Sequence, residues 1–227
     1  MAASLLKGLV AAALAAFALS ACATESDSDS EDDNVADTGE TNDELRSSPL
    51  GESDMVQIDA PANMPAVWTQ PDSEGWHGAR GKCGSTALAN DLRLYSIEKS
   101  PDDLDNDGVH FVVGTLQFEI EGWLKKNHPE LGCRTSYPWD GAKALRGQLD
   151  GGHPVMVWFN LGGGFGESHW VTAVGHHGSG DDEKVVVMSW GRYYEIPMKK
   201  LDDASKWVYG MRHPTIICSK TTDKIVR

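Results

Sequence analysis

Hydrophobic positions change their spacing in the second half of the chain. Before residue 150, apolar residues recur every three or four positions, which is the period of amphipathic helices. This spacing predicts helices over 85–95, 113–127 and 143–149. Beyond it, short apolar runs alternate with glycine-rich turns and predict strands over 154–159, 168–175, 184–190 and 192–198. Helices followed by neighbouring strands favour an α+β fold with an antiparallel sheet.

The N-terminal pattern is that of an export signal. Lys7 precedes an unbroken run of small and apolar residues over 8–18, which is too short to span a bilayer as a helix. The sequence Leu-Ser-Ala-Cys over 19–22 resembles the lipobox of bacterial lipoproteins. This resemblance implies that residues 1–21 are a signal peptide and that the mature chain begins at a lipid-carrying Cys22. The alternative is an ordinary secretory signal in which Cys22 is incidental.

Residues 22–55 have no apolar period and predict a disordered tether. From 23 to 54 there are 12 acidic residues against the single base Arg46, and most other positions are small or polar. Such a segment buries too little apolar surface to offset the entropy of ordering it. It accounts for −11 of the formal charge of −14, and no basic run favours nucleic-acid binding. We therefore expect one folded domain over 56–227.

The expected domain contains three cysteines, Cys83, Cys133 and Cys218. Export would place them in oxidising conditions, where thiols tend to pair. Because three is an odd number, one is left over and is a candidate reactive thiol. This count does not say which one, and Cys83 remains open as a disulfide partner or a small buried hydrophobic residue.

Cys83 and His169 form a candidate nucleophile and base. Cys83 opens the predicted helix over 85–95, where the helix dipole and free N–H groups favour a thiolate. His169 begins a predicted strand behind a glycine-rich loop over 162–166, and an imidazole there could accept the thiol proton. The alternative for His169 is a histidine satisfied within the core.

Three segments carry a family resemblance. GKCGSTALANDLRLY (81–95), GGHPVMVWFNLGGGFGESHWVTAVGHH (151–177) and VVVMSWGRYYEIPMKKL (185–201) resemble bacteriocin-leader-processing (double-glycine) peptidases, a papain-fold group of cysteine peptidases. The resemblance implies a papain-like α+β fold with the nucleophile helix packed on a C-terminal antiparallel sheet. It also implies that Cys83 is the nucleophile and His169 the general base. If Cys83 is free, Cys133 and Cys218 form the disulfide.

The third catalytic position departs from the family pattern. The family places an Asp or Asn on the strand after the His strand, and the matching residue is Met188, with Ser189 next. Methionine cannot usefully accept the imidazole N–H, so Ser189 is our candidate orienting residue. Gln70 is the candidate oxyanion-hole residue, and His77, which lies nearer to Cys83, is the alternative.

An acidic segment over 101–108, expected to be a loop, resembles the first half of a calcium-binding loop. Asp103, Asp105 and Asp107 alternate before Gly108, but the twelfth position is Gly114 and lacks the bidentate carboxylate. These three aspartates are candidate calcium ligands, and the alternative is an acidic surface loop. The proposed chemistry itself requires no cofactor.

The sequence therefore predicts a membrane-tethered cysteine peptidase or amidase that acts on peptides or proteins by an acyl-enzyme mechanism. Two alternatives remain: a catalytically impaired papain-fold binding lipoprotein, suggested by Met188, and an acyl or amide transferase. Ala23, rather than Asp, follows the expected lipidated cysteine. By resemblance to lipoprotein sorting in two-membrane bacteria, this favours the outer membrane.

Overall fold

The computed structural model describes residues 48–69, 82–109, 115–136, 140–161, 168–208 and 211–226. All of them belong to one compact unit, Thr41–Arg227. The predicted signal peptide, Cys22, Gln70 and His77 lie outside the described residues. Within the described ranges, no helix is both long and apolar enough to cross a bilayer.

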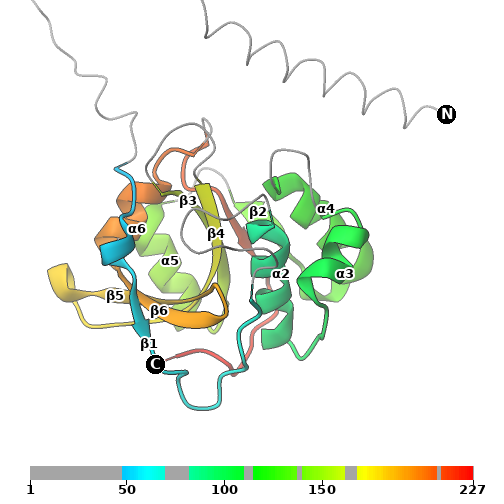
Figure 1. The fold of residues 1–227 in the computed structure, drawn as a ribbon, viewed down its shortest axis with the longest axis horizontal. Helices are drawn as coiled ribbons and strands as arrows, with labels where there is room; N and C mark the ends of the chain where they lie inside the picture. The colour runs from blue at the N-terminus through cyan, green and yellow to red at the C-terminus, as the bar shows by residue number, and fades with distance from the viewer. Residues whose placement is uncertain are drawn as a thin grey trace, which may run out of the picture. The chain divides into compact units, whose positions relative to one another are not determined.

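The described strands form one antiparallel sheet in the order β1-β6-β5-β4-β3-β7-β2 (Figure 1). The strands are β1 (Val56–Ile58), β2 (Arg134–Ser136), β3 (Val155–Asn160), β4 (Ser168–His177), β5 (Lys184–Ser189), β6 (Arg192–Pro197) and β7 (Thr215–Ile217). The central strands β3, β4 and β5 are buried along most of their length. Their continuous apolar runs are therefore explained by helices on both faces of the sheet.

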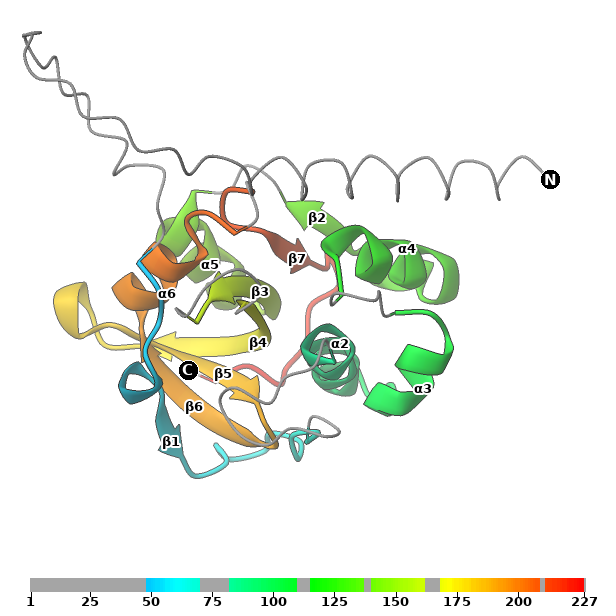
Figure 2. The ribbon, with the colours of Figure 1, turned by 45° about the horizontal axis from the view of Figure 1, so that its top comes forward.

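The described residues contain five helices, which form two groups (Figure 2). The first group contains α2 (Cys83–Leu94), α3 (Pro101–Asn106) and α4 (Gln117–Asn127), and the second contains α5 (Gly141–Asp150) and α6 (Met198–Ser205). Short 3₁₀ turns occur at η2 (Glu52–Asp54), η3 (Pro129–Leu131) and η4 (Gly180–Asp182).

Strand alternation divides the core into two layers. Met156, Trp158 and Trp170 point to the side covered by α2 and α4, where they join one apolar cluster. Val157 and Val171 point the other way, into a cluster completed by residues of α5 and α6. Each strand residue thus faces the helical group opposite to that of its neighbour. The predicted α+β fold with a helix on the antiparallel sheet is confirmed.

The structure corrects three sequence-based expectations about elements. The segment expected to be an acidic loop is helical over Pro101–Asn106, where Ser100 Oγ accepts the Asp103 N–H at the N-cap. The short strands β1, β2 and β7 and the helix α6 were not predicted. Leu50 and Met55, assigned to the tether, are buried in the α5–α6 core layer, and the Leu50 N–H donates to the Asn160 carbonyl oxygen at 2.9 Å. The folded part therefore begins before Val56.

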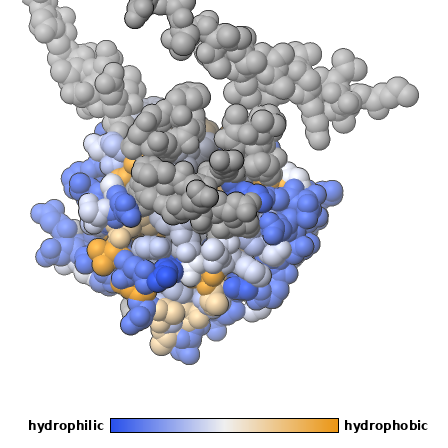
Figure 3. Space-filling model, viewed as in Figure 1, coloured by the Kyte–Doolittle hydropathy of each residue, from blue (hydrophilic) through white to orange (hydrophobic). Residues whose placement is uncertain are grey.

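The described surface is mainly hydrophilic on the face shown in Figure 3, with hydrophobic residues gathered in small separate patches. Val56 and Phe118 are the large hydrophobic residues with high exposure among those described. Most of the apolar content of the domain therefore lies in the two core layers.

Candidate active site

Cys83 occupies the first position of α2 and is the free cysteine of the described residues. Burial raises the pKa of its thiol to about 11. The backbone N–H groups of Trp170, Gly84 and Cys83 itself oppose this effect and lower the pKa. The sulfur therefore lies where first-turn amides and one strand amide converge.

The first turn of α2 is held by hydrogen bonds from its own polar side chains and by the close packing of Gly84 against Thr115. The Lys82 carbonyl oxygen accepts from Thr86 N–H at 3.0 Å, Thr86 Oγ1 at 2.9 Å and Ser85 Oγ at 3.0 Å. At Gly84, an added Cβ would overlap the Thr115 side chain. Glycine is therefore the residue that allows this part of α2 to lie against Thr115.

His169 is the second residue of β4 and is paired in register with Phe159 on β3. Its Nε2 atom lies 2.8 Å from Ser189 Oγ, and its ring stacks on Trp190 with centroids 4.1 Å apart. Only 1% of the residue is exposed, and this burial lowers the pKa of the imidazole to about 3. The other ring nitrogen, Nδ1, is buried without a hydrogen-bond partner among the described residues.

Ser189, and not Met188, shares the side of the sheet that carries His169. Met188 is opposite Thr172 in register and packs with Val174 and Tyr193 on the side that α2 covers. Ser189 is one residue further along β5, so its side chain points the other way. The structure therefore brings the candidate orienting residue Ser189 to the imidazole.

Cys83 and His169 are related through the backbone of β4. The backbone N–H of Trp170, the residue after His169, donates a hydrogen bond to the Cys83 sulfur and lowers the pKa of the thiol. The Trp170 ring also donates from Nε1 to the Thr115 carbonyl oxygen at 3.0 Å. In the described part of the chain, no hydrogen bond joins the sulfur to the His169 ring. The His169 ring packs with Phe159 and Trp190 on the side of the sheet opposite to α2, whereas Cys83 belongs to the α2 layer. The structure therefore brings the backbone of β4, and not the imidazole, to the Cys83 sulfur.

Burial sets the charge states of the two groups. It favours the neutral thiol at Cys83 and the neutral imidazole at His169, so near pH 7 the structure holds a neutral pair. If Nε2 carries the ring proton, it donates to Ser189 Oγ, and Nδ1 is free to accept a proton. A neutral thiol and a neutral imidazole do not form a preformed thiolate–imidazolium ion pair.

Cys133 and Cys218 form a disulfide, as the sequence predicts for a free Cys83. Cys133 directly precedes β2 and Cys218 directly follows β7, so the bond links two paired strands at one edge of the sheet. All three cysteines belong to the same core layer, next to α2.

Trp68, two residues before the candidate oxyanion-hole residue Gln70, is held in place by two backbone hydrogen bonds. The Trp68 N–H donates to Asn90 Oδ1 on α2 at 2.7 Å, and the Trp68 carbonyl oxygen accepts from Gly191 N–H at 3.1 Å. The Arg93 guanidinium lies 4.2 Å from the Trp68 ring centroid. Gln70 and His77 fall outside the described residues, so their assignment stays a prediction.

The candidate calcium ligands do not converge on one point. Because α3 is helical, Asp103 and Asp107 lie about one turn apart, whereas Asp105 points to the other side. Asp103 bonds Ser100, Asp105 lies 3.6 Å from the Lys82 ammonium, and Asp107 lies 3.4 Å from Lys99. No group of three metal-ligating side chains occurs within the described ranges. The helix therefore does not form the expected calcium loop.

Trp190 is a site residue that the sequence reasoning missed. It lies in the tight turn between β5 and β6 with a φ of 42°, an uncommon conformation for a bulky residue. Its ring stacks on His169 and meets the Tyr194 ring edge-on at 5.9 Å. The signal available was the Ser-Trp-Gly sequence directly after a predicted strand.

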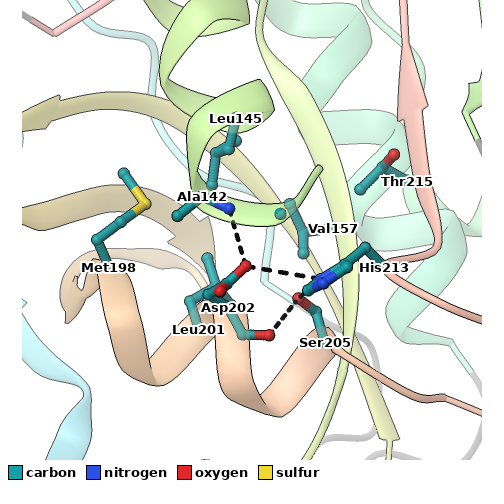
Figure 4. Close-up of a pocket in the computed structure, with 10 residues that line it drawn as sticks. Ala142, Leu145, Val157, Met198, Leu201, Asp202, Ser205, His213 and Thr215 are labelled. Atoms are coloured by element: carbon teal, nitrogen blue, oxygen red, sulfur yellow. Dashed lines mark hydrogen bonds and ion pairs between the residues drawn. The ribbon is translucent and has the colours of Figure 1, made fainter. Parts of the chain in front are cut away.

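A second polar cluster surrounds a small cavity of about 20 Å³ beside α5 and α6 (Figure 4). Ser205 Oγ lies 3.0 Å and Asp202 Oδ1 3.7 Å from the same nitrogen of His213, Nδ1. A histidine relay needs its two partners on different ring nitrogens. Asp202 Oδ1 also accepts the Ala142 N–H at 2.8 Å in the first turn of α5, so the cluster stabilises a helix start. The cavity has room for one water molecule.

Comparison with known proteins identifies the fold. No family model and no curated protein matches the chain. Among solved structures, it is similar to a Bacillus anthracis protein assigned as a C39-like peptidase, with a TM-score of 0.52 and 18% identity over 74% of this chain and 99% of that one. It is also similar to the peptidase domain of Streptococcus ComA, a bifunctional ABC transporter of a quorum-sensing pathway, with a TM-score of 0.46 and 16% identity over 68% and 98%. The chain therefore has the papain-like α+β fold of C39-like peptidases.

Proposed function

We propose that this protein is a lipid-anchored cysteine peptidase or amidase in which Cys83 is the nucleophile and His169 the general base. The observation that carries the proposal is the placement of the free Cys83 at the start of α2, with backbone amides converging on its sulfur beside the His169 strand. The fold of C39-like peptidases supports a peptide or protein as substrate.

In the proposed reaction, Cys83 Sγ attacks the carbonyl carbon of the scissile amide as its proton moves to His169 Nδ1. The first-turn N–H groups of Cys83 and Gly84 have no partners within the helix and would stabilise the oxyanion. The imidazolium then gives its proton to the departing amine, which leaves a thioester. Water, deprotonated by His169, hydrolyses the thioester and restores the thiol.

Ser189 would hold the His169 ring through Nε2, and Trp190 would hold it by stacking. A hydroxyl stabilises an imidazolium less than a carboxylate does, so we expect slower turnover than an Asp or Asn would support. The proposal also requires the His169 ring to turn to the α2 side of the sheet, because in the structure it packs with Phe159 and Trp190 on the other side.

A second candidate is a papain-fold binding lipoprotein without catalysis. The neutral thiol, the neutral imidazole and the missing hydrogen bond between them favour it. The test is turnover of a fluorogenic peptide-amide library by the full chain and by Cys83→Ala, with the rate of iodoacetamide reaction at Cys83. Cys83-dependent turnover is the result expected of a peptidase. A thiol that stays inert near pH 7, together with no Cys83-dependent turnover, would establish the binding protein instead.

The anchor is a separate part of the proposal and rests on the sequence over 1–22. We expect Cys22 to take up a radiolabelled fatty acid in cells, and Cys22→Ser to abolish that label. An inhibitor of lipoprotein signal cleavage should leave the signal attached. Unchanged cleavage in its presence would contradict the anchor, and fractionation of the envelope would test the expected outer-membrane location.

A further inference from the structure

A buried carboxyl lies beside the disulfide. Asp91, two turns along α2 from Cys83, is only 2% exposed, and its Oδ2 atom lies 3.9 Å from Cys218 Sγ. A disulfide sulfur carries no proton, so this contact is not a hydrogen bond while Cys133 and Cys218 are joined. Reduction would place a thiol S–H donor directly against the carboxyl.

We propose that the Cys133–Cys218 disulfide is a reducible site whose opening is coupled to proton loss from Asp91. The coupling arises because the oxidised and the reduced protein differ in the hydrogen-bond donor that faces the Asp91 carboxyl. In the oxidised protein, the Cys218 sulfur that lies against the Asp91 carboxyl cannot donate a hydrogen bond. In the reduced protein, Cys218 can donate to the carboxylate, and hydrogen bonding to the charged form favours ionisation.

The electrostatic surroundings of Asp91 agree with this assignment. Burial raises the pKa of its carboxyl to about 7, and no charged group offsets that effect. Tyr95 directly follows α2, and the Asp91 charge adds to the burial that raises the pKa of the Tyr95 phenol. From the C-terminal tail, the Lys220 carbonyl oxygen accepts the Tyr95 hydroxyl at 3.2 Å. From the β2–β7 side, Cys218, which is bonded to Cys133, faces the carboxyl.

The position of the disulfide makes local opening feasible. The bond lies at the end of the β2–β7 pair, and β2 is a three-residue strand at the edge of the sheet. Cys133 and Cys218 are 6% and 3% exposed, so a reductant must reach them by opening this edge. Short edge segments open at lower free energy than central strands.

The step balances with a dithiol as reductant. Its thiolate attacks Cys133 Sγ, the S–S bond breaks, and Cys218 leaves as a thiolate that takes the proton from Asp91. The second reductant sulfur then attacks the mixed disulfide and releases Cys133, which takes a proton from solvent. The dithiol loses two electrons and two protons and becomes a cyclic disulfide, and the protein disulfide gains the electrons. Because Cys133 takes back one of these protons and Cys218 takes its proton from Asp91, one proton is released to solvent in the net reaction.

The test measures the reduction equilibrium against dithiothreitol redox buffers in the full chain carrying Cys22→Ser and Cys83→Ser, which leaves only these two cysteines. Since thiols stay largely protonated below about pH 7, we expect the reduced fraction at fixed buffer ratio to rise with pH from about pH 5 to about pH 7. A pKa that falls by about one unit on reduction, from about 7, gives about a fivefold change in the equilibrium constant between these two pH values. Asp91→Asn should abolish the change, and Asp59→Asn, at an exposed position, should keep it.

A measurement on the protein with native Asp91 covers the case in which Asp91→Asn does not fold. Infrared difference spectra should show that a protonated carboxyl signal becomes weaker on reduction near pH 6. An unchanged carboxyl signal, the same pH dependence in Asp91→Asn, or reduction that occurs only together with loss of the circular dichroism of the fold would each overturn the proposal. The inference does not depend on peptidase activity, because Cys83 is absent from the tested protein.

Discussion

His169 Nε2 lies 2.8 Å from Ser189 Oγ, and this contact directs the other ring nitrogen, Nδ1, away from the serine. The two residues come from neighbouring strands, β4 and β5, and both are almost completely buried. The contact settles which residue after the His strand meets the imidazole, because Met188 faces the opposite side of the sheet.

Removing the Ser189 hydroxyl should affect both stability and reactivity. Ser189→Ala leaves His169 Nε2 buried without a partner, at a cost of about 1–3 kcal/mol in the free energy of unfolding. Turnover that depends on Cys83 should fall, because the ring is no longer oriented. Ser189→Thr keeps the hydroxyl and is the matched control, measured by urea unfolding and by peptide-amide hydrolysis. Equal losses of activity in both variants would show that the hydroxyl does not orient the ring.

His169 should make the folded state sensitive to acid. Its pKa is about 3 in the folded protein and near 6.5 when unfolded, so the unfolded state binds the proton first as the pH falls. The stabilising contribution is complete above pH 6.5 and is lost between there and pH 3, by up to about 1.4 kcal/mol per pH unit.

The measurement is the difference in unfolding free energy between wild type and His169→Gln at several pH values. We expect this difference to shrink as the pH falls. His177→Gln, at an exposed position, should track the wild type. A difference that is independent of pH would mean that His169 is not buried in its neutral form.

Because Gly84 packs closely against Thr115, replacing it with alanine should affect stability differently from the same replacement at an open glycine. Gly84→Ala places a methyl group into the Thr115 side chain, so it should destabilise the fold or displace the start of α2 and slow the reaction of Cys83 with iodoacetamide. Gly122→Ala in α4 meets nothing within 4 Å and should stabilise by about 0.5–1 kcal/mol, because alanine favours helix more than glycine does. Thermal unfolding of the two variants distinguishes these outcomes. A stabilising Gly84→Ala would contradict the packing described.

Leu50 should contribute to the core although it lies in an acidic segment. Its side chain is completely buried, so Leu50→Ala should cost about 2–5 kcal/mol of unfolding free energy. Val56→Ala is the control, since Val56 is 53% exposed and such surface changes are usually within about 0.5 kcal/mol. Deletion of residues 1–54 should likewise destabilise the protein relative to deletion of 1–47. Equal stability of these two truncations would place the boundary at Val56 after all.

The long, strongly periodic segments could be predicted from the sequence. The 3.6-residue period predicted α2, α4 and α5, and continuous apolar runs predicted β3 to β6, because periodicity directly reports the face that a long element buries. The strands β1, β2 and β7 have three residues each, which is too short for a period to be recognised. The helix α3 was not predicted, because its aspartates suggested a metal-binding loop. In the structure these aspartates cap the helix and form ion pairs.

The sequence by itself determined the candidate chemistry: a cysteine at a helix start, a histidine at a strand start, and the pairing of Cys133 with Cys218 for a free Cys83. Only the tertiary structure decided that Ser189 rather than Met188 meets the imidazole, because successive side chains of a strand face opposite sides and a shift of one residue exchanges them. It also decided the direction in which the pKa values of Cys83, His169 and Asp91 shift, since the burial that causes each shift depends on residues distant in the chain.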